Sequence, residues 1–218
     1  MARYLDIETW SRRQQFEFFK NFDNPYFNIC ANVDITPLLA LTRVTPDISF
    51  FITYHFLSMK AANEVESFRY RLRGDRVLVH ERIHAGTTLL LADESFTFVY
   101  FDFDHDFEPF HTHAKAAVEK AQAGKSRLDE REGQDDLIHH SVIPWVTFTS
   151  ISHARNWGRQ DSVPKIAFGK YRADGERIRM PISVEAHHAL MDGLHVGRYF
   201  EKLESYFSNP RPALNLLK

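Results

Sequence analysis

The chain has 218 residues, of which 44% are hydrophobic and 26% are charged, and its formal net charge is −2. This composition is typical of one globular domain, and residues 1–218 are treated as a single domain. Such a chain buries roughly 70% of the surface of its unfolded form, so it can build a sizeable core. The near-neutral charge lacks the clustered cations that bind phosphates, which excludes a nucleic-acid partner.

Cysteine content and the N-terminus indicate the compartment. Cys30 is the single cysteine and cannot form an intramolecular disulfide. The first 15 residues carry charges where a signal peptide has an apolar stretch. The richest apolar window, residues 48–59, is interrupted by polar residues and falls short of the roughly 18 apolar residues of a membrane span. The sequence therefore predicts a cytoplasmic protein with no membrane partner.

Alternating and helical hydrophobic patterns predict the elements of the first 65 residues. In chain order these are a strand over 3–10, a helix capped by Ser11, a strand over 28–35, a helix over 37–43 and a helix over 46–65.

The Gly-Asp pair at 74–75 lies between two alternating runs and predicts a hairpin. The remaining predicted elements are strands over 87–91, 95–103, 144–151, 165–171 and 178–186, helices over 107–123 and 192–207, and a solvated loop over 124–136. Several consecutive strands between helices indicate α/β layers with a mixed sheet, since a doubly wound fold would alternate strand and helix.

The segment from His187 to Gly193 carries the clearest chemical signal. His188 stands four residues before the Asp192-Gly193 pair, where a predicted strand gives way to a predicted helix. This position places an imidazole in a cleft. The carboxylate at the helix N-terminus is stabilised by the backbone dipole and can pair with a cation, so Asp192 is predicted to be an architectural anchor.

Five segments in order over nearly the whole chain resemble the trimeric chloramphenicol acetyltransferases, within the wider group of HxxxDG acyltransferases. They are residues 10–18, 33–36, 141–148, 169–171 and 187–197. The resemblance implies a two-layer α/β sandwich with a mixed sheet. It also implies a homotrimer whose active sites lie between neighbouring subunits.

The resemblance implies that His188 is the general base, oriented by its own backbone. It removes the proton of an acceptor hydroxyl that attacks the thioester of acetyl-CoA directly, with no acyl-enzyme. Neutral imidazole suits proton abstraction at cellular pH. Ser141 matches the serine that stabilises the oxyanion, while from the residues alone it could be a solvated strand-end serine.

Further roles are implied around these two residues. Arg12 and Asp192 match a buried salt bridge that supports the site, although without the motif Arg12 would be expected to be an exposed helix residue. Lys170 and Tyr171, with Trp145, match residues that bind the CoA co-substrate, and a solvated sheet edge is the alternative.

The acceptor pocket implied by the resemblance contains Phe18, Phe19, Phe27, Phe96 and His153, and core packing is the alternative for Phe18, Phe27 and Phe96. Departures from the family concentrate here: Ala167 replaces a threonine, Phe19 replaces a tyrosine, and residues 152–157 are polar where apolar side chains are common. Buried polar groups that a substrate leaves unpaired cost roughly 1–3 kcal/mol each, so a polar acceptor could fit better than chloramphenicol.

Close histidine pairs at 111/113, 139/140 and 187/188 raise the alternative of a metal site. Adjacent histidines on a strand point to opposite faces, so no metal is predicted. The predicted activity is chloramphenicol O-acetylation with acetyl-CoA as co-substrate. The alternatives are acyl transfer to another hydroxyl or thiol acceptor, and a homologue that binds a ligand without catalysis.

Overall fold

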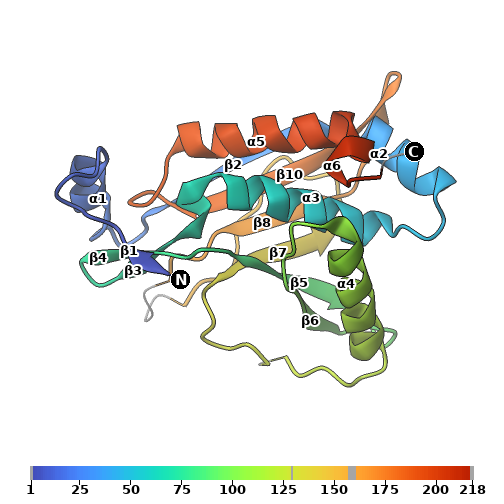
Figure 1. Cartoon of the computed structure of the whole chain (residues 1–218), viewed down its shortest axis with the longest axis horizontal. Helices are drawn as coiled ribbons and strands as arrows, with labels where there is room; N and C mark the ends of the chain where they lie inside the picture. Colours follow the sequence, from blue (N-terminus) through green and yellow to red (C-terminus); the bar gives the residue numbers. More distant parts are fainter. Residues whose placement is uncertain (1, 129, 157–160, 217–218) are drawn as a thin grey trace.

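The computed structural model describes residues 2–128, 130–156 and 161–216. A large mixed sheet carries helices on one face, which confirms the predicted two-layer α/β class (Figure 1). The helices are α1 (Arg13–Phe19), α2 (Thr36–Val44), α3 (Phe50–Glu64), α4 (Phe107–Gln122), α5 (Gly193–Ser208) and α6 (Pro210–Ala213), with the 3-10 turn Glu66–Arg69. The strands are β1 (Arg3–Tyr4), β2 (Tyr26–Asp34), β3 (Tyr70–Arg73), β4 (Arg76–Val79), β5 (His84–Leu90), β6 (Phe96–Phe101), β7 (Leu137–Ile143), β8 (Lys165–Gly169), β9 (Arg172–Asp174) and β10 (Arg177–His187).

The order of strands in the large sheet is β2-β10-β8-β7-β5-β6, and β9 pairs with β10. β7 runs parallel to both β5 and β8, whereas the other pairs are antiparallel. A separate sheet, β1-β4-β3, lies beside α1 at one end of the molecule (Figure 1). The predicted hairpin forms its β3-β4 pair, with Gly74 at a φ of 60° in the turn.

The alternation of side chains along β7 separates the core from the open face of the sheet. Ile138 is fully buried in the core, and His140 Nε2 lies 3.4 Å from Ser58 Oγ of α3. His139 and Ser141 alternate with these residues and therefore point to the face without helices. The sequence prediction that neighbouring histidines face opposite ways applies here.

Polar groups form a buried network between the sheet and α3. His55 Nδ1 lies 2.8 Å from the carbonyl of Phe51, and its Nε2 lies 3.0 Å from Thr87 Oγ1. Ser58 Oγ lies 2.8 Å from the hydroxyl of Tyr199. Burial lowers the pKa of His55 to about 4, so this imidazole is neutral in the folded protein.

Two strand predictions were wrong in extent. Residues 144–151 form turns and coil, and the strand lies just before them, as β7. Pro144 has no N–H for a sheet ladder, which explains why the strand ends at Ile143. The predicted strand over 3–10 is reduced to Arg3 and Tyr4, the two residues that pair with β4.

Two helix starts also differ from the predictions. Ser11 does not cap α1, because the helix begins at Arg13 with Arg12 as the N-cap residue. The helix predicted from residue 46 begins at Phe50, where Ser49 Oγ accepts a hydrogen bond from the N–H of Ile52.

In the part of the chain that the structure describes, no helix is long and apolar enough to cross a membrane.

Acidification should destabilise the fold through His55. Its pKa is about 4 when folded and about 6.5 when unfolded, so the unfolded chain binds more protons between these values. The free energy of unfolding should be highest above pH 6.5 and fall as the pH decreases toward 4, by about 3 kcal/mol for this one residue. Urea unfolding at pH 7.5 and 4.5 measures the loss.

His55→Gln cannot titrate and is the matched control. Its free energy of unfolding should decrease less than that of the wild type over the same pH range. Equal losses in the two proteins would contradict the assignment.

Candidate active site

The site is built on the turn that joins β10 to α5. β10 ends at His187, and the N–H groups of Leu190 and Met191 donate to its carbonyl at 2.9 and 3.2 Å. The N–H of His188 donates to the carbonyl of Pro25 at 2.7 Å, which fixes this residue against the chain entering β2. The turn therefore presents the His188 side chain at one end of the sheet.

Arg12 binds this turn from the start of α1. Its Nη2 donates to the carbonyl of His188 at 3.1 Å and its Nη1 to the carbonyl of Ala189 at 3.3 Å. Its Nε lies 3.3 Å from Asp192 Oδ2. Only 10% of the Arg12 side chain is exposed, against 34% of Asp192, so the ion pair is buried on the arginine side.

Aromatic rings hold the imidazole of His188. Phe19 of α1 stacks on it, with ring centroids 4.0 Å apart and an interplanar angle of 5°, and Phe27 of β2 packs at 4.8 Å. His188 Nδ1 is buried and has no hydrogen-bond partner among the described residues. The resemblance implied that the backbone orients this ring; here the carbonyl of His188 accepts from Arg12, and stacking orients the ring.

His195 is not among the predicted site residues, yet it contacts Asp192. Its Nδ1 lies 2.8 Å from Asp192 Oδ1 and 3.2 Å from the backbone nitrogen of Asp192. Burial alone would raise the pKa of Asp192, but His195, Arg12 and the N–H of Leu194 outweigh it and lower that pKa. An N-cap aspartate followed three residues later by a polar side chain was the available sequence signal.

A cavity of about 600 Å³ opens on the face of the sheet without helices. The residues that line it are both apolar and polar: Phe96, Phe98, Tyr100, Leu128, Thr88, Arg131, Glu132, Gln134, His139, His140, Ser141, His153 and Lys165, with Gly86, Gly133 and Ala154. A Cβ at Gly86 would lie 3.2 Å from the Tyr100 ring, so a small residue there leaves room for that ring.

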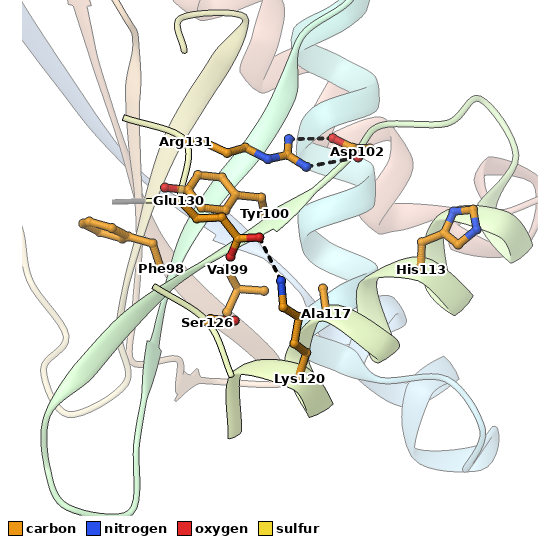
Figure 2. Close-up of a pocket in the computed structure, with 10 residues that line it drawn as sticks. All are labelled: Phe98, Val99, Tyr100, Asp102, His113, Ala117, Lys120, Ser126, Glu130 and Arg131. Carbon is orange, nitrogen blue, oxygen red and sulfur yellow. Dashed lines mark hydrogen bonds and ion pairs between the residues drawn. The ribbon is translucent and has the colours of Figure 1, made fainter. Parts of the chain in front are cut away.

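A second, smaller pocket of about 200 Å³ lies between β6 and α4 and shares Phe98, Tyr100 and Arg131 with the cavity (Figure 2). Its charges are paired: Arg131 donates to both carboxylate oxygens of Asp102 at 2.7 and 3.1 Å, and Lys120 donates to Glu130 at 2.8 Å. These pairs brace the cavity wall, because the Arg131 guanidinium also lies 5.0 Å from the centre of the Tyr100 ring.

Ser141 and His188 do not meet within one chain. Ser141 is opposite Ala167, which is opposite Ser183 on β10. His188 lies five positions beyond Ser183, or about 16 Å along the strand direction. Ser141, Phe96 and His153 line the cavity, whereas His188 and the phenylalanines beside it do not.

The predicted acceptor residues thus divide into two groups. Phe19 and Phe27 contact His188, and Phe18 meets Phe19 edge to face while 64% of its surface is exposed. Phe96 and His153 line the cavity with Ser141. Core packing, the alternative weighed for Phe18 and Phe96, is wrong, since both are exposed.

A buried ion pair supports the wall that carries His153. Arg155 pairs with Glu185 of β10, with 7% and 8% of the two side chains exposed. His153 Nδ1 lies 3.7 Å from Glu185 Oε2. Of the polar segment 152–157, Trp157 lies outside the described residues.

Trp145, Lys170 and Tyr171 follow the carboxyl ends of the neighbouring strands β7 and β8. The N–H of Lys170 donates to the carbonyl of Val146 at 2.9 Å, and Thr147 Oγ1 donates to the carbonyl of Lys170 at 2.9 Å. A Cβ at Gly169 would lie 2.6 Å from Pro181 and 2.7 Å from Phe148, so only glycine allows this packing. Trp145 and Tyr171 are 60% and 40% exposed.

The described residues contain no group of three or more His, Cys, Asp or Glu side chains that could hold a metal ion.

Solved structures share this fold. A dihydrolipoamide acetyltransferase of Azotobacter vinelandii superposes with a TM-score of 0.67 at 17% identity, over 93% of this chain and 88% of that one, which shows a common fold. A chloramphenicol acetyltransferase superposes with a TM-score of 0.84 at 28% identity, over 95% of this chain and all of that one. The chain therefore has the fold that these two acetyltransferases share.

Sequence comparison identifies the family among proteins of this fold. The family model "Chloramphenicol acetyltransferase" matches residues 2–204. Chloramphenicol acetyltransferase 3 of Escherichia coli is 25% identical over 92% of this chain and 94% of its own length. The enzyme of Streptomyces acrimycini is 27% identical over 94% of each chain. The chain belongs to the chloramphenicol acetyltransferase family.

Arg12→Leu should lower the free energy of unfolding by about 3 kcal/mol, because it leaves two backbone carbonyls and the Asp192 carboxylate without their cation. Arg13→Leu is the matched control: Arg13 is the next residue, it is half exposed, and it pairs with Glu8 at the surface. Its loss should stay within about 0.5 kcal/mol. Urea unfolding at pH 7.5 measures both, and equal effects would refute the anchoring role of Arg12.

Proposed function

We propose that this protein is a chloramphenicol O-acetyltransferase that transfers the acetyl group of acetyl-CoA directly to an acceptor hydroxyl. The observation that carries the proposal is the placement of His188, whose backbone is held by Arg12 and whose ring is held by Phe19. The family match over residues 2–204 supports the same reaction.

His188 is the general base in this mechanism. Its Nε2 takes the proton of the acceptor hydroxyl while that oxygen forms a bond to the carbonyl carbon of the thioester. The tetrahedral intermediate carries its negative charge on the former carbonyl oxygen, to which the Ser141 hydroxyl donates a hydrogen bond. Collapse breaks the carbon–sulfur bond, and the imidazolium returns its proton to the CoA sulfur.

The distance between the two groups supports a trimer with shared active sites. His188 lies at one end of the sheet and Ser141 lies near its middle, about 16 Å away along the strand direction, so one chain does not supply both to a single acetyl group. In the proposed homotrimer, the His188 end of one subunit faces the Ser141 cavity of its neighbour. The exposed Phe18 and Phe96 side chains would then meet an acceptor between subunits.

The surface formed by Trp145, Lys170 and Tyr171, beyond the carboxyl ends of β7 and β8, fits the co-substrate. The exposed aromatic rings offer surfaces on which an adenine or the pantetheine chain can pack. The ammonium of Lys170 suits the CoA phosphates. Together these residues are proposed to bind acetyl-CoA.

A more polar acceptor is the second candidate, and the composition of the cavity favours it. His139 and Lys165 are paired in the strand register, and with His153 they add three nitrogen-bearing side chains beside Ser141. An acceptor that hydrogen-bonds these groups would bind better than an apolar one. Assaying a panel of hydroxyl and thiol compounds beside chloramphenicol distinguishes the two candidates.

CoA release from acetyl-CoA in the presence of chloramphenicol tests the reaction itself. His188→Ala should decrease kcat by about 10³-fold or more, because the base is lost. Ser141→Ala should decrease it by about 10²-fold, the effect of one oxyanion donor. A wild-type protein that binds acetyl-CoA but releases no CoA with chloramphenicol would favour another acceptor; failure to bind acetyl-CoA would favour the non-catalytic alternative.

Co-expression of His188→Ala with Ser141→Ala tests the shared site. In randomly mixed trimers, about a quarter of the interfaces would pair an intact His188 with an intact Ser141, so activity should return to about that fraction of the wild-type value. The two variants purified separately and mixed without subunit exchange are the control. No recovery in co-expressed trimers would show that each site lies within one chain.

A further inference from the structure

His195 adds a third residue to the Arg12–Asp192 pair that holds the turn between β10 and α5. Asp192 Oδ2 faces the Arg12 guanidinium, and Asp192 Oδ1 faces both the Leu194 N–H at 3.0 Å and His195 Nδ1 at 2.8 Å. The two oxygens of one carboxylate are thus held from opposite sides. The side chain of His195 is 17% exposed, so this contact is largely shielded from water.

The position of His195 Nδ1 allows two hydrogen-bonding arrangements. If Nδ1 carries the proton, it donates to the carboxylate at 2.8 Å, which is the usual length of a charge-assisted bond. If Nδ1 is unprotonated, it accepts a hydrogen bond from the N–H of Asp192 at 3.2 Å. The unprotonated nitrogen then lies 2.8 Å from the carboxylate oxygen Oδ1. The first arrangement places two N–H donors 3.2 Å apart, whereas the second places a lone pair 2.8 Å from a charged oxygen. The contact with the charged oxygen is the shorter one, so the geometry favours the first arrangement.

We infer that His195 is a positioning residue for acetyl transfer: its Nδ1–H holds the Asp192 carboxylate in place for Arg12, and Arg12 holds the backbone of His188. This inference rests on the proposed function. Each link is a hydrogen bond given above, from His195 to Asp192, from Arg12 to Asp192 and from Arg12 to the carbonyl of His188. His195 does not touch the reacting atoms and acts through the turn.

The position of the His188 ring depends on its backbone. Its Nδ1 has no partner among the described residues, so no side-chain hydrogen bond at that atom corrects a displacement of the turn. Stacking on Phe19 fixes the ring plane but allows sliding within that plane. Loosening Asp192 should therefore misplace Nε2 relative to the acceptor hydroxyl, which decreases kcat and leaves substrate binding largely intact.

Three substitutions of His195 separate the donor from the ring. His195→Asn would place an amide donor where Nδ1 lies, His195→Gln would place a donor nearer the position of Nε2, and His195→Leu would remove the donor. His195→Leu should decrease kcat about tenfold with KM for chloramphenicol and acetyl-CoA within about threefold. His195→Asn should restore most of kcat, and His195→Gln should restore little. Glu204→Ala, at an exposed position on the same helix, is the control.

A double-mutant cycle with Arg12→Lys tests whether the effect passes through Arg12. If it does, His195→Leu should lower kcat less in the Arg12→Lys background than in the wild type. Independent, additive losses would overturn the inference, as would an unchanged kcat or equal rescue by the asparagine and glutamine variants. All assays run well below the melting temperature of the weakest variant, so that loss of the helix cap does not enter kcat.

The tautomer of His195 can be measured in the absence of an acceptor substrate. Nitrogen-15 NMR of histidine-labelled protein at pH 8, assigned by the spectrum of His195→Asn, should show the proton on Nδ1. A proton on Nε2 would overturn the inference. Absence of wild-type CoA release with chloramphenicol would contradict the proposed function alone, and the tautomer would still decide whether His195 holds Asp192.

Discussion

The guanidinium of Arg12 connects the start of α1 to the turn between β10 and α5. Arg12, at the first turn of the N-terminal helix, binds two backbone carbonyls and a carboxylate that lie some 180 residues away in sequence. Burial lowers the pKa of Arg12 while Asp192 opposes that change. Because a buried cation is costly without several acceptors, the contact specifies one arrangement of the β10-α5 turn, and the placement of His188 depends on it.

The rest of the site follows from the alternation of side chains on a sheet covered on one face. Helices α3, α4 and α5 cover one face of the sheet, and Ile138 and His140 of β7 are buried on that side. The residues that alternate with them, including His139 and Ser141, remain on the open face and line the cavity. A mutation that shifted the register of β7 by one residue would exchange these roles, since successive side chains point to opposite faces.

The different histidine environments explain why histidine content alone says little about function. His55 and His140 are buried, uncharged parts of the core network, and burial lowers the pKa of both. His188 stands at the sheet end between aromatic rings, and its Nδ1 has no partner among the described residues. His195 binds a carboxylate at a helix start. The surroundings of each ring, and not its neighbours in sequence, set its chemistry.

Local hydrophobic periodicity predicted the α/β class, the 73–76 hairpin and most helices, and the resemblance of five segments in order indicated the family. The resemblance predicts that Ser141 and His188 serve one reaction. Only the tertiary structure decided that they lie about 16 Å apart along the sheet, that Phe19 stacks on His188, and that His195 joins the Arg12–Asp192 anchor. Strand register and the meeting of distant segments fix these contacts, and neither is encoded in a local pattern. The failed strand over 144–151 has the same origin: its alternation is real, but Pro144 and the packing around Gly169 turn the chain away from the sheet.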